Sequence, residues 1–394
     1  MAFFSQKPDP QSQVPQGTVI YNTELEHPWY RIENTDELDS PALVVYPARV
    51  KENIRMAIEM AGSPERLRPH VKTHKSPEAT RLLLEAGIHK FKCATIAEAE
   101  MLAICGAPDV LLAYQPVGPK LQRFVSLIRK YPGTKFSCLV DHPDAARAMS
   151  DAFSAHQLRV PVYVDLNVGM NRTGIIPGSA AAQLYGDCAQ LPGILPVGLH
   201  AYDGHCRDKD LQQSKLRCDE GFAKVAALQA QLEAKGFSRP IIIAGGSPTF
   251  PIHSQRPQIE CSPGTFIYWD KGYSDLCPDQ PFLPAALVVT RVISQPGSTL
   301  LCLDLGHKSI SAENELARRV YFLNAPDLKA VSQSEEHLVV EAGPGHGWKP
   351  GDLLYGLPIH ICPTVALYER ARTIENGLVT GEWSNRARDR KITL

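Results

Sequence analysis

The 394-residue sequence predicts an α/β chain: a (β/α)8 TIM-type barrel followed by a C-terminal β domain. Three observations carry this prediction. Short apolar segments alternate with longer amphipathic ones up to residue 246. Beyond about residue 280 the pattern changes to strands with turn signals and little helix. The chain is also longer than the roughly 250 residues that a barrel alone requires.

Eight apolar segments are the predicted barrel strands. Near-continuous apolar character is typical of parallel strands that are buried on both faces. Parallel strands need right-handed crossovers, so eight strand-then-helix units predict a closed barrel, with a doubly wound open sheet as the alternative. The segments are 42–47, 67–73, 90–95, 109–114, 135–141, 160–167, 196–202 and 239–246.

The stretches between these segments have helical patterns. Residues 47–61 place Val50, Ile54, Ala57 and Ile58 on one stripe. The stretch from Ser76 begins with Ser-Pro and ends in Gly, which are good helix start and stop signals. We therefore expect an N-terminal arm over residues 1–37 that packs with the β domain, the barrel over 38–278, and the β domain over 279–394.

Composition excludes several classes of protein. A net charge of -1 gives no indication of a nucleic-acid or membrane-surface partner. No apolar run approaches the roughly 20 residues that span a bilayer, and the Pro- and Gln-rich start does not resemble a secretory signal. The ten cysteines are scattered, which favours free thiols in a reducing cytoplasm.

Lys72 is the leading candidate for a reactive side chain. Barrel active sites lie at the carboxyl ends of the strands, and Lys72 falls within the second predicted strand. The two-residue period of a strand puts Arg68, His70 and Lys72 on one face. A cation nearby would lower the pKa of the amine and free it for imine formation. Lys75 is the competitor, but it lies beyond the strand.

Two further motifs are candidate ligand sites. Gly245, Gly246 and Ser247 follow a predicted strand, where glycines let backbone N–H groups approach a phosphate; taken alone, the motif favours a plain turn over a phosphate site. His360 and Cys362 stand two residues apart in an apolar segment, and on a strand they would point the same way. An imidazole and a thiolate suit Zn²⁺ or a similar divalent ion.

Several segments in this order resemble one family. They are RPHVKTHK, KCATIAEAEMLAICGAPDVLLAY, DLNVGMNRTG, GLHAYDGH, AGGSPTF, SPGTFIYWDKGY, SEEH and PIHICPT. Together they resemble the D-threonine aldolase and D-serine dehydratase family of fold-type III pyridoxal-phosphate enzymes, which are related to alanine racemase. The resemblance covers roughly residues 38–390.

The resemblance implies roles for individual residues. Lys72 would carry pyridoxal phosphate, and His360 with Cys362 would bind one divalent metal ion, Zn²⁺, Mn²⁺ or Co²⁺. The glycine turn would hold the phosphate, with Tyr268 as a weaker candidate. The predicted cofactor-binding residues are Lys72, His70, Arg172, Tyr202, Gly245, Gly246, Ser247 and Tyr268, and the predicted catalytic residues are Lys72, His205 and Arg172.

The resemblance leaves the reaction open between two branches of the family. The His-x-Cys pair is typical of the dehydratases, whereas the aldolases carry His-x-Asp. The histidine that aldolases use on the β-hydroxyl corresponds here to Asp208, and the nearest histidine is His205. LDLGHKSISAE and GLHAYDGH favour the aldolase branch.

We therefore expect a lyase of D-β-hydroxy-α-amino acids, with a slight preference for retro-aldol cleavage to glycine and an aldehyde. Dehydration of D-serine or D-3-hydroxyaspartate is the alternative. An amino-acid racemase and a non-catalytic cofactor-binding protein are the remaining alternatives. A homodimer in the cytoplasm, without nucleic-acid or membrane partners, completes the prediction.

Overall fold

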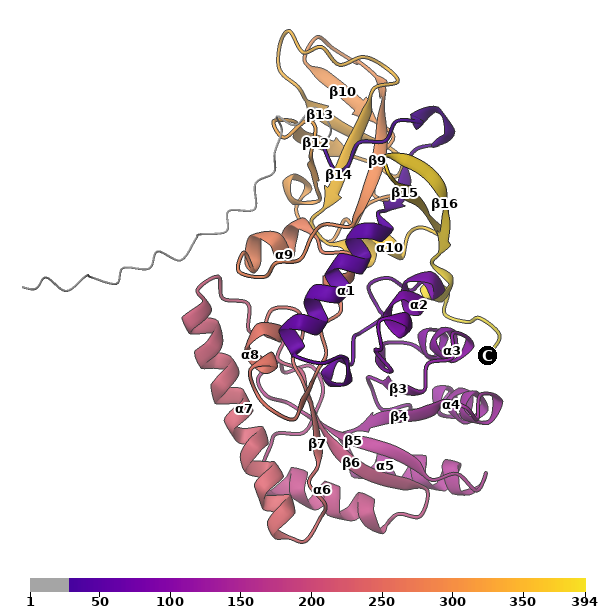
Figure 1. The fold of residues 1–394 in the computed structure, drawn as a ribbon, viewed down its shortest axis with the longest axis vertical. Helices are drawn as coiled ribbons and strands as arrows, with labels where there is room; N and C mark the ends of the chain where they lie inside the picture. The colour runs from indigo at the N-terminus through magenta and orange to yellow at the C-terminus, as the bar shows by residue number, and fades with distance from the viewer. Residues whose placement is uncertain (1–27) are drawn as a thin grey trace, which may run out of the picture.

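The structure is a computed structural model that describes residues 28–394. It has two parts, one above the other in Figure 1. The lower part contains a seven-stranded parallel sheet in the order β2-β3-β4-β5-β6-β7-β8. The upper part contains a nine-stranded, mostly antiparallel sheet built around β9. The predicted class, a barrel followed by a β domain, is confirmed.

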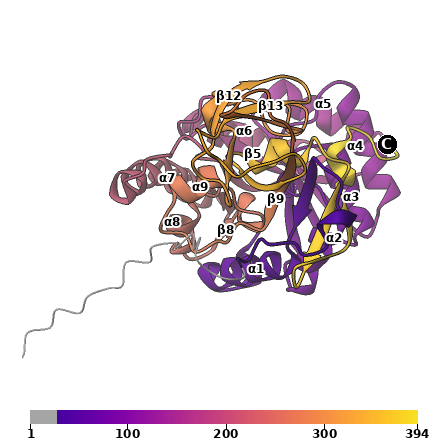
Figure 2. The ribbon, with the colours of Figure 1, turned by 90° about the horizontal axis from the view of Figure 1, so that it is seen from above.

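Helices surround the parallel strands, as the view from above shows (Figure 2). The strands of this part are β2 (Lys90–Cys93), β3 (Asp109–Leu112), β4 (Lys135–Val140), β5 (Val160–Leu166), β6 (Ile194–Ala201), β7 (Ile241–Ala244) and β8 (Ile259–Cys261). The helices are α1 (Pro47–Ala61), α2 (Pro77–Glu85), α3 (Ile96–Ile104), α4 (Pro119–Lys130), α5 (Pro143–Ser154), α6 (Ser179–Gln190), α7 (Leu211–Ala234), α8 (Phe250–Ser254) and α9 (Lys271–Leu276).

An extended segment, residues 67–70, closes the barrel between β8 and β2. Arg68 N donates to Cys261 O on one side, and Lys92 N donates to Pro69 O on the other, at 2.8 and 2.9 Å. Isolated parallel bridges join Leu67 to Cys261 and His70 to Lys92. The eighth position of the barrel is therefore filled, which rules out the open doubly wound sheet.

The first predicted barrel strand belongs to the other domain. Residues 42–45 form β1 (Ala42–Val45), which pairs antiparallel with β9 and parallel with β15 in the upper sheet. The prediction that residues 42–47 form a barrel strand is wrong, because an apolar strand buried on both faces fits either sheet. The barrel strand that the sequence did not reveal is β8, which has only three residues.

Sequence signals account for the helix starts. Ser76 is the N-cap of α2 and its side chain accepts from Ala79 N, while Thr95 caps α3 by accepting from Glu98 N. Asp210 caps α7 in the same way. These caps satisfy backbone N–H groups that have no partner within the helix.

The upper sheet contains β1 and the strands that follow the barrel. Asn376 and Gly377 have positive φ angles and form the tight turn between its last two strands. These strands are β9 (Ala286–Ser294), β10 (Leu300–Leu303), β11 (Val320–Phe322), β12 (Lys329–Gln333), β13 (Leu338–Glu341), β14 (Leu353–Pro358), β15 (Arg370–Glu375) and β16 (Leu378–Ser384). A short helix, α10 (Ile361–Val365), follows β14 at the junction with the barrel (Figure 1).

The described part of the predicted N-terminal arm packs on the upper sheet. Tyr30 and Ile32 share an apolar cluster with residues of β1, β9 and β14, and so does Leu38, the first residue of the range predicted as barrel. Ile32 N donates to the Tyr355 hydroxyl at 3.0 Å. Residues 1–27 of the arm lie outside the described residues.

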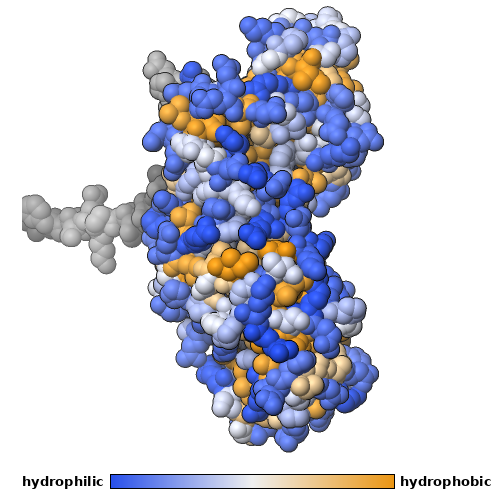
Figure 3. Space-filling view, turned by 90° about the vertical axis from the view of Figure 1, so that its right-hand side faces the viewer, coloured by the Kyte–Doolittle hydropathy of each residue, from blue (hydrophilic) through white to orange (hydrophobic). Residues whose placement is uncertain are grey.

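The surface shown in Figure 3 is mostly hydrophilic over both parts, with separate small apolar patches. Among residues 28–394, no helix combines the length and the apolar character needed to cross a bilayer. Most of the buried apolar residues belong to one large core cluster that runs through the barrel, its helices and part of the upper sheet.

Candidate active site

A cavity of about 300 Å³ opens at the carboxyl ends of the barrel strands. Six of the predicted site residues line it: His70, Lys72, Arg172, Tyr202, Gly246 and Ser247. The sequence assigned no role to the other residues that line it, which are Lys92, Ala94, Ala113, Tyr114, Thr173, His200, Ser262, Gly264, Thr265 and Tyr273. The predicted location of the site, at the strand ends, is therefore where these side chains meet.

Lys72 lies in a turn directly after the closing segment 67–70, and not within a strand as the sequence suggested. The turn places its exposed side chain at the cavity, and its backbone N donates to His70 Nδ1 at 3.2 Å. Lys75 is held elsewhere, because its amine pairs with the buried carboxylate of Glu98. Of the two lysines weighed from the sequence, only Lys72 reaches the cavity.

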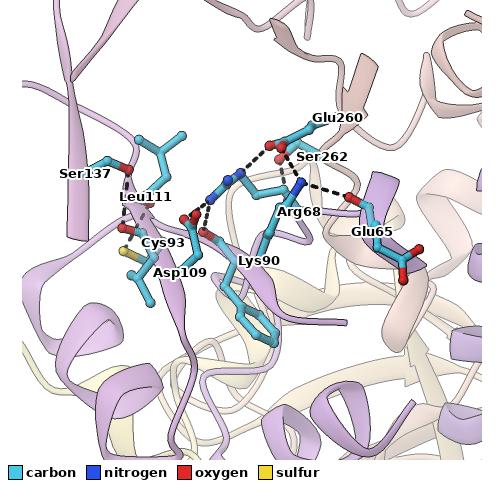
Figure 4. A network of polar contacts seen from close by, with 11 residues as sticks. Glu65, Arg68, Lys90, Cys93, Asp109, Leu111, Ser137, Glu260 and Ser262 are labelled. Carbon is cyan, nitrogen blue, oxygen red and sulfur yellow. Dashed lines mark hydrogen bonds and ion pairs between the residues drawn. The ribbon is translucent and has the colours of Figure 1, made fainter. Parts of the chain in front are cut away.

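Arg68 faces the barrel interior, as the strand period predicts for the residue two positions before His70. Its buried guanidinium donates to Glu260 Oε2 at 2.7 Å and to Asp109 Oδ1 at 2.6 Å (Figure 4). These two carboxylates satisfy its charge below the cavity. His70 stays neutral, since burial and then the charges of Lys92 and Lys72 hold its pKa well below the usual value.

The glycine turn after β7 fits its surroundings only without side chains. Gly245 has a φ of 80°, and a Cβ there would lie 2.6 Å from His253 Cδ2. A Cβ on Gly246 would lie 2.9 Å from the ring of Tyr202. Ser247 is buried, and its Oγ accepts from Thr265 N at 3.2 Å. Backbone can therefore approach a ligand closely here.

A second polar cluster braces this turn from behind. Asp203 accepts from Thr249 Oγ1 at 2.7 Å and from His253 Nε2 at 2.8 Å, while Cys218 Sγ lies 3.4 Å from His253 Nε2. Asp203, Cys218 and His253 could geometrically hold a metal ion. However, the guanidinium of Arg256 donates to His253 Nδ1 at 2.6 Å, and a cation beside a guanidinium would be repelled.

Of the predicted catalytic and cofactor-binding residues, His205, Tyr268 and Gly245 do not line the cavity. His205 lies against Gly169, and its Nδ1 is buried without a hydrogen-bond partner among the described residues. Tyr268 is fully buried, its hydroxyl likewise finds no partner within residues 28–394, and burial raises its pKa. Tyr273, five residues further on, does line the cavity, together with Tyr114 and Tyr202.

Arg172 and Tyr202 lie together at the cavity. The guanidinium carbon of Arg172 lies 4.9 Å from the centroid of the Tyr202 ring. This distance is typical of a cation–π contact, which orients a flexible arginine. Arg172 therefore presents a positive charge beside the glycine turn, from the loop that follows β5.

His360 and Cys362 meet, although not by the geometry that the sequence suggested. β14 ends at Pro358, so His360 is the N-cap of α10 and Cys362 lies in its first turn. The two side chains hydrogen-bond with each other. Cys362 Sγ also lies 3.1 Å from Thr73 Oγ1, directly after Lys72 in the chain. The pair is therefore next to the cavity.

The pair has the charge pattern of a metal-ligand site. Burial would raise the pKa of the Cys362 thiol, but the His360 hydrogen bond and the Lys72 charge bring it below the usual value. A thiolate is the form that binds metal ions. Burial lowers the pKa of His360, but Cys362 and Glu313 outweigh burial and raise it to about 9. Burial raises the pKa of the neighbouring Asp270 to about 6.

The cavity fits pyridoxal phosphate on the observations above. It contains an exposed lysine amine, a two-glycine turn with no room for a Cβ at Gly246, and the cationic Arg172. The lysine amine can bond to an aldehyde, and the glycine turn and Arg172 suit a phosphate group. The imidazole and thiol of His360 and Cys362 fit a borderline divalent ion.

Curated relatives are similar over most of the chain. The D-threonine aldolase of an Arthrobacter species is 28% identical over 89% of this chain and 93% of its own length. The 3-hydroxy-D-aspartate aldolase of Paracoccus denitrificans (strain Pd 1222) is 26% identical over 89% of this chain and 92% of its own. The D-threo-3-hydroxyaspartate dehydratase of Delftia sp. (strain HT23) is 28% identical over 59% of this chain and 62% of its own.

The crystal structure of D-threonine aldolase from Filomicrobium marinum is similar with a TM-score of 0.83 and 26% identity, over 91% of this chain and 98% of the other. Residues 285–374 match the model described as "Putative serine dehydratase domain". Residues 45–271, more than half of the chain, match the model of the alanine racemase N-terminal domain, and the chain belongs to that family.

Proposed function

We propose that this protein is a lyase of D-β-hydroxy-α-amino acids that uses pyridoxal phosphate and one divalent metal ion. The observation that carries the proposal is the meeting of Lys72, the Gly246 turn and the His360–Cys362 pair around one strand-end cavity. The relatives named as D-threonine aldolase and 3-hydroxy-D-aspartate aldolase support the retro-aldol version.

Each residue has a distinct role in this proposal. Lys72 would bind the cofactor covalently through its amine, and Gly246 with Ser247 would hold the phosphate. Arg172, fixed against the Tyr202 ring, would face the bound cofactor. Pyridoxal phosphate supplies an electron sink for a bond broken at the α-carbon. His360 and Cys362 would hold the metal ion, which stabilises negative charge on a substrate oxygen.

A dehydratase is the second candidate, and the thiol ligand favours it. A cysteine at the metal, paired with His360, is the pattern that resembles the dehydratase branch. The relative named as D-threo-3-hydroxyaspartate dehydratase supports it, and a cysteine-to-alanine variant of that enzyme has been crystallised in a metal-free form. In this version Lys72 would remove the α-proton while the metal assists the departing hydroxyl.

Product analysis separates the two reactions. Purified protein supplied with pyridoxal phosphate and Mn²⁺ or Zn²⁺ would be incubated with D-threonine, D-3-hydroxyaspartate and D-serine in turn. Glycine with an aldehyde identifies the aldolase, whereas a ketoacid with ammonia identifies the dehydratase. If none of the three substrates is consumed, the proposed function is wrong.

We also propose a cytoplasmic homodimer, in which the β domain of one subunit helps to cover the barrel of the other. All ten cysteines are free, as a reducing compartment would require. We propose that the barrel ends at residue 278 and that the β domain begins at residue 279. The early strand β1 is part of the β domain, because it lies in the same sheet. Light scattering at micromolar concentration tests the dimer, and a monomer would contradict it.

A further inference from the structure

Lys92 is a buried amine that has no carboxylate partner among residues 28–394. It is the third residue of β2, it is 3% exposed, and it lines the cavity. No carboxylate of the described residues lies within ion-pair distance of Lys92, although Lys75 and Lys90 each have one. A buried lysine that only filled space would normally be paired, because an isolated buried charge is costly.

The nearest polar atom to this amine belongs to a short chain of hydrogen bonds. Lys92 Nζ lies 3.5 Å from His200 Nε2. On its other side, His200 Nδ1 donates to Asp165 Oδ1 at 2.7 Å. Because Nδ1 carries the hydrogen, Nε2 presents a lone pair to Lys92. Asp165 and His200 are both about as buried as Lys92, so water does not replace either partner.

The charges around Lys92 favour its neutral form near neutral pH. Burial, and then the positive charge of Lys72, lower the pKa of Lys92 to about 7. Burial lowers the pKa of His200. Asp165 keeps a pKa below its usual value despite burial, because His200 donates to it. The charged and titratable groups around Lys92 are Lys72, Asp165, Asp203, Arg68, His70, His200 and Tyr202.

These three residues together can store one proton. With a neutral amine, a neutral imidazole and the Asp165 carboxylate, the chain carries a charge of about -1, and one added proton brings it to zero. Because a net negative charge is costly in a buried site, uptake of this proton by the three-residue chain is favourable. This is the property required of a general base with a pKa near the working pH.

Retro-aldol cleavage needs such a base, and the residue predicted for it lies elsewhere. His205 does not line the cavity, and Asp208 is engaged with Arg217, whose Nε lies 3.4 Å from its Oδ2. Lys92 does line it, 5.8 Å from the centroid of the Tyr202 ring.

We propose that Lys92 is the catalytic base of this cavity, with His200 and Asp165 as positioning residues behind it. The inference rests on the proposed lyase function. The amine takes the proton of the substrate's β-hydroxyl, and the electrons of the O–H bond form the carbonyl of the aldehyde. The Cα–Cβ bond breaks, its electron pair remains with the α-carbon, and the proton returns there to give glycine.

The Lys92→Met variant tests the role, because methionine keeps the length of the side chain and removes its amine. We expect kcat to fall by about 10²- to 10⁴-fold. The visible absorption of the bound cofactor should persist, and borohydride should still fix the cofactor to Lys72. Exogenous methylamine should restore part of the activity of Lys92→Ala. Lys51→Met, which removes an exposed lysine of α1, is the matched control.

A pH profile separates positioning from a merely structural role for Asp165. Its carboxylate raises the pKa of Lys92. Asp165→Asn should therefore move the acid limb of the kcat profile to lower pH, whereas a structural defect would lower kcat without moving the limb. Competitive trace labelling of amines in wild-type protein, followed by peptide mapping, should give Lys92 a titration midpoint well below that of Lys51.

Two results would overturn the inference. One is a Lys92→Met variant that turns over as fast as an active wild-type enzyme, or that no longer binds the cofactor. The other is a Lys92 amine that titrates together with the exposed lysines. An inactive wild-type protein would instead refute the proposed function, and the labelling experiment would still decide whether Lys92 has the titration that a base requires.

Discussion

Lys90 and Lys92 lie two residues apart on β2, and their surroundings differ in kind. Lys90 Nζ pairs with Glu260 Oε1 at 2.5 Å, in the same network as Arg68 and Asp109 at the closed end of the barrel (Figure 4). Lys92 lines the cavity at the open end, and its Nζ lies 3.5 Å from His200 Nε2 with no carboxylate of residues 28–394 within ion-pair distance. Charges at the closed end neutralise one another, and charges at the cavity do not.

This difference separates residues that hold the barrel together from residues that are available for chemistry. Removing a partner from a satisfied network leaves a buried charge behind and costs stability. Removing an unpaired amine costs no partner, so its loss should affect activity rather than folding. Variants at the closed end should therefore lose stability, whereas variants at the open end should lose turnover.

The largest expected effect is at the open end, at Lys72. Lys72→Ala should lower activity by at least about a thousandfold, because covalent attachment and orientation of the cofactor are lost. The melting temperature should change little, since the side chain is exposed. Borohydride reduction followed by peptide mapping measures the attachment. A label on Lys75 or Lys92 in the wild-type protein would contradict the assignment.

The closed end should give a loss of stability instead. Arg68→Met leaves Asp109 without its counter-charge and Glu260 with Lys90 alone, and should lower the free energy of unfolding by about 3–5 kcal/mol. Urea denaturation followed by circular dichroism measures this loss. Arg55→Met, which removes two exposed ion pairs on α1, is the control and should change nothing measurable. An Arg68 variant as stable as the wild type would remove the contrast between the two ends.

The metal pair should behave like the open end. EDTA treatment, or Cys362→Ser, should lower activity by about a hundredfold or more while the colour of the bound cofactor persists. The cofactor would stay because, in the proposed site, Lys72 would hold it independently of the metal ion. Metal analysis before and after dialysis measures the loss, with Cys302→Ser of β10 as the control. Full activity in protein shown to contain no metal would refute the site.

The smallest effect is a gain of stability in Lys92→Met, of about 1–3 kcal/mol at neutral pH. The pKa of Lys92 is about 7 in the folded protein and about 10.4 in an unfolded chain, so folding opposes its protonation. As the pH increases from the lower to the higher of these two values, the stability of the wild type should rise relative to that of the variant. Below the lower value the difference in stability between the two proteins should not change further. Urea midpoints across this range measure it; equal pH dependence would mean that Lys92 is hydrated.

The sequence predicted the architecture because most barrel strands are local apolar runs with helical stretches between them. It could not place residues 42–45, since their hydrogen-bond partners are strands far away in the chain. β8 was not predicted because its three residues are too few to show a pattern of apolar residues. The sequence indicated Lys72, Arg172, Tyr202 and the glycine turn by residue type and position. It did not indicate a role for Lys92, because only the folded barrel reveals that the amine lacks a carboxylate partner.

The pairing of β1 constrains how the chain can be made. Val44 lies opposite Leu287 in β9 and opposite Arg372 in β15, so β1 cannot complete its sheet until almost the whole chain has left the ribosome. Contacts so distant in sequence form slowly, and an unpaired apolar strand invites aggregation while it waits. Truncations after the barrel should therefore accumulate as insoluble protein, and the barrel alone should not be obtainable by simply stopping translation at residue 278.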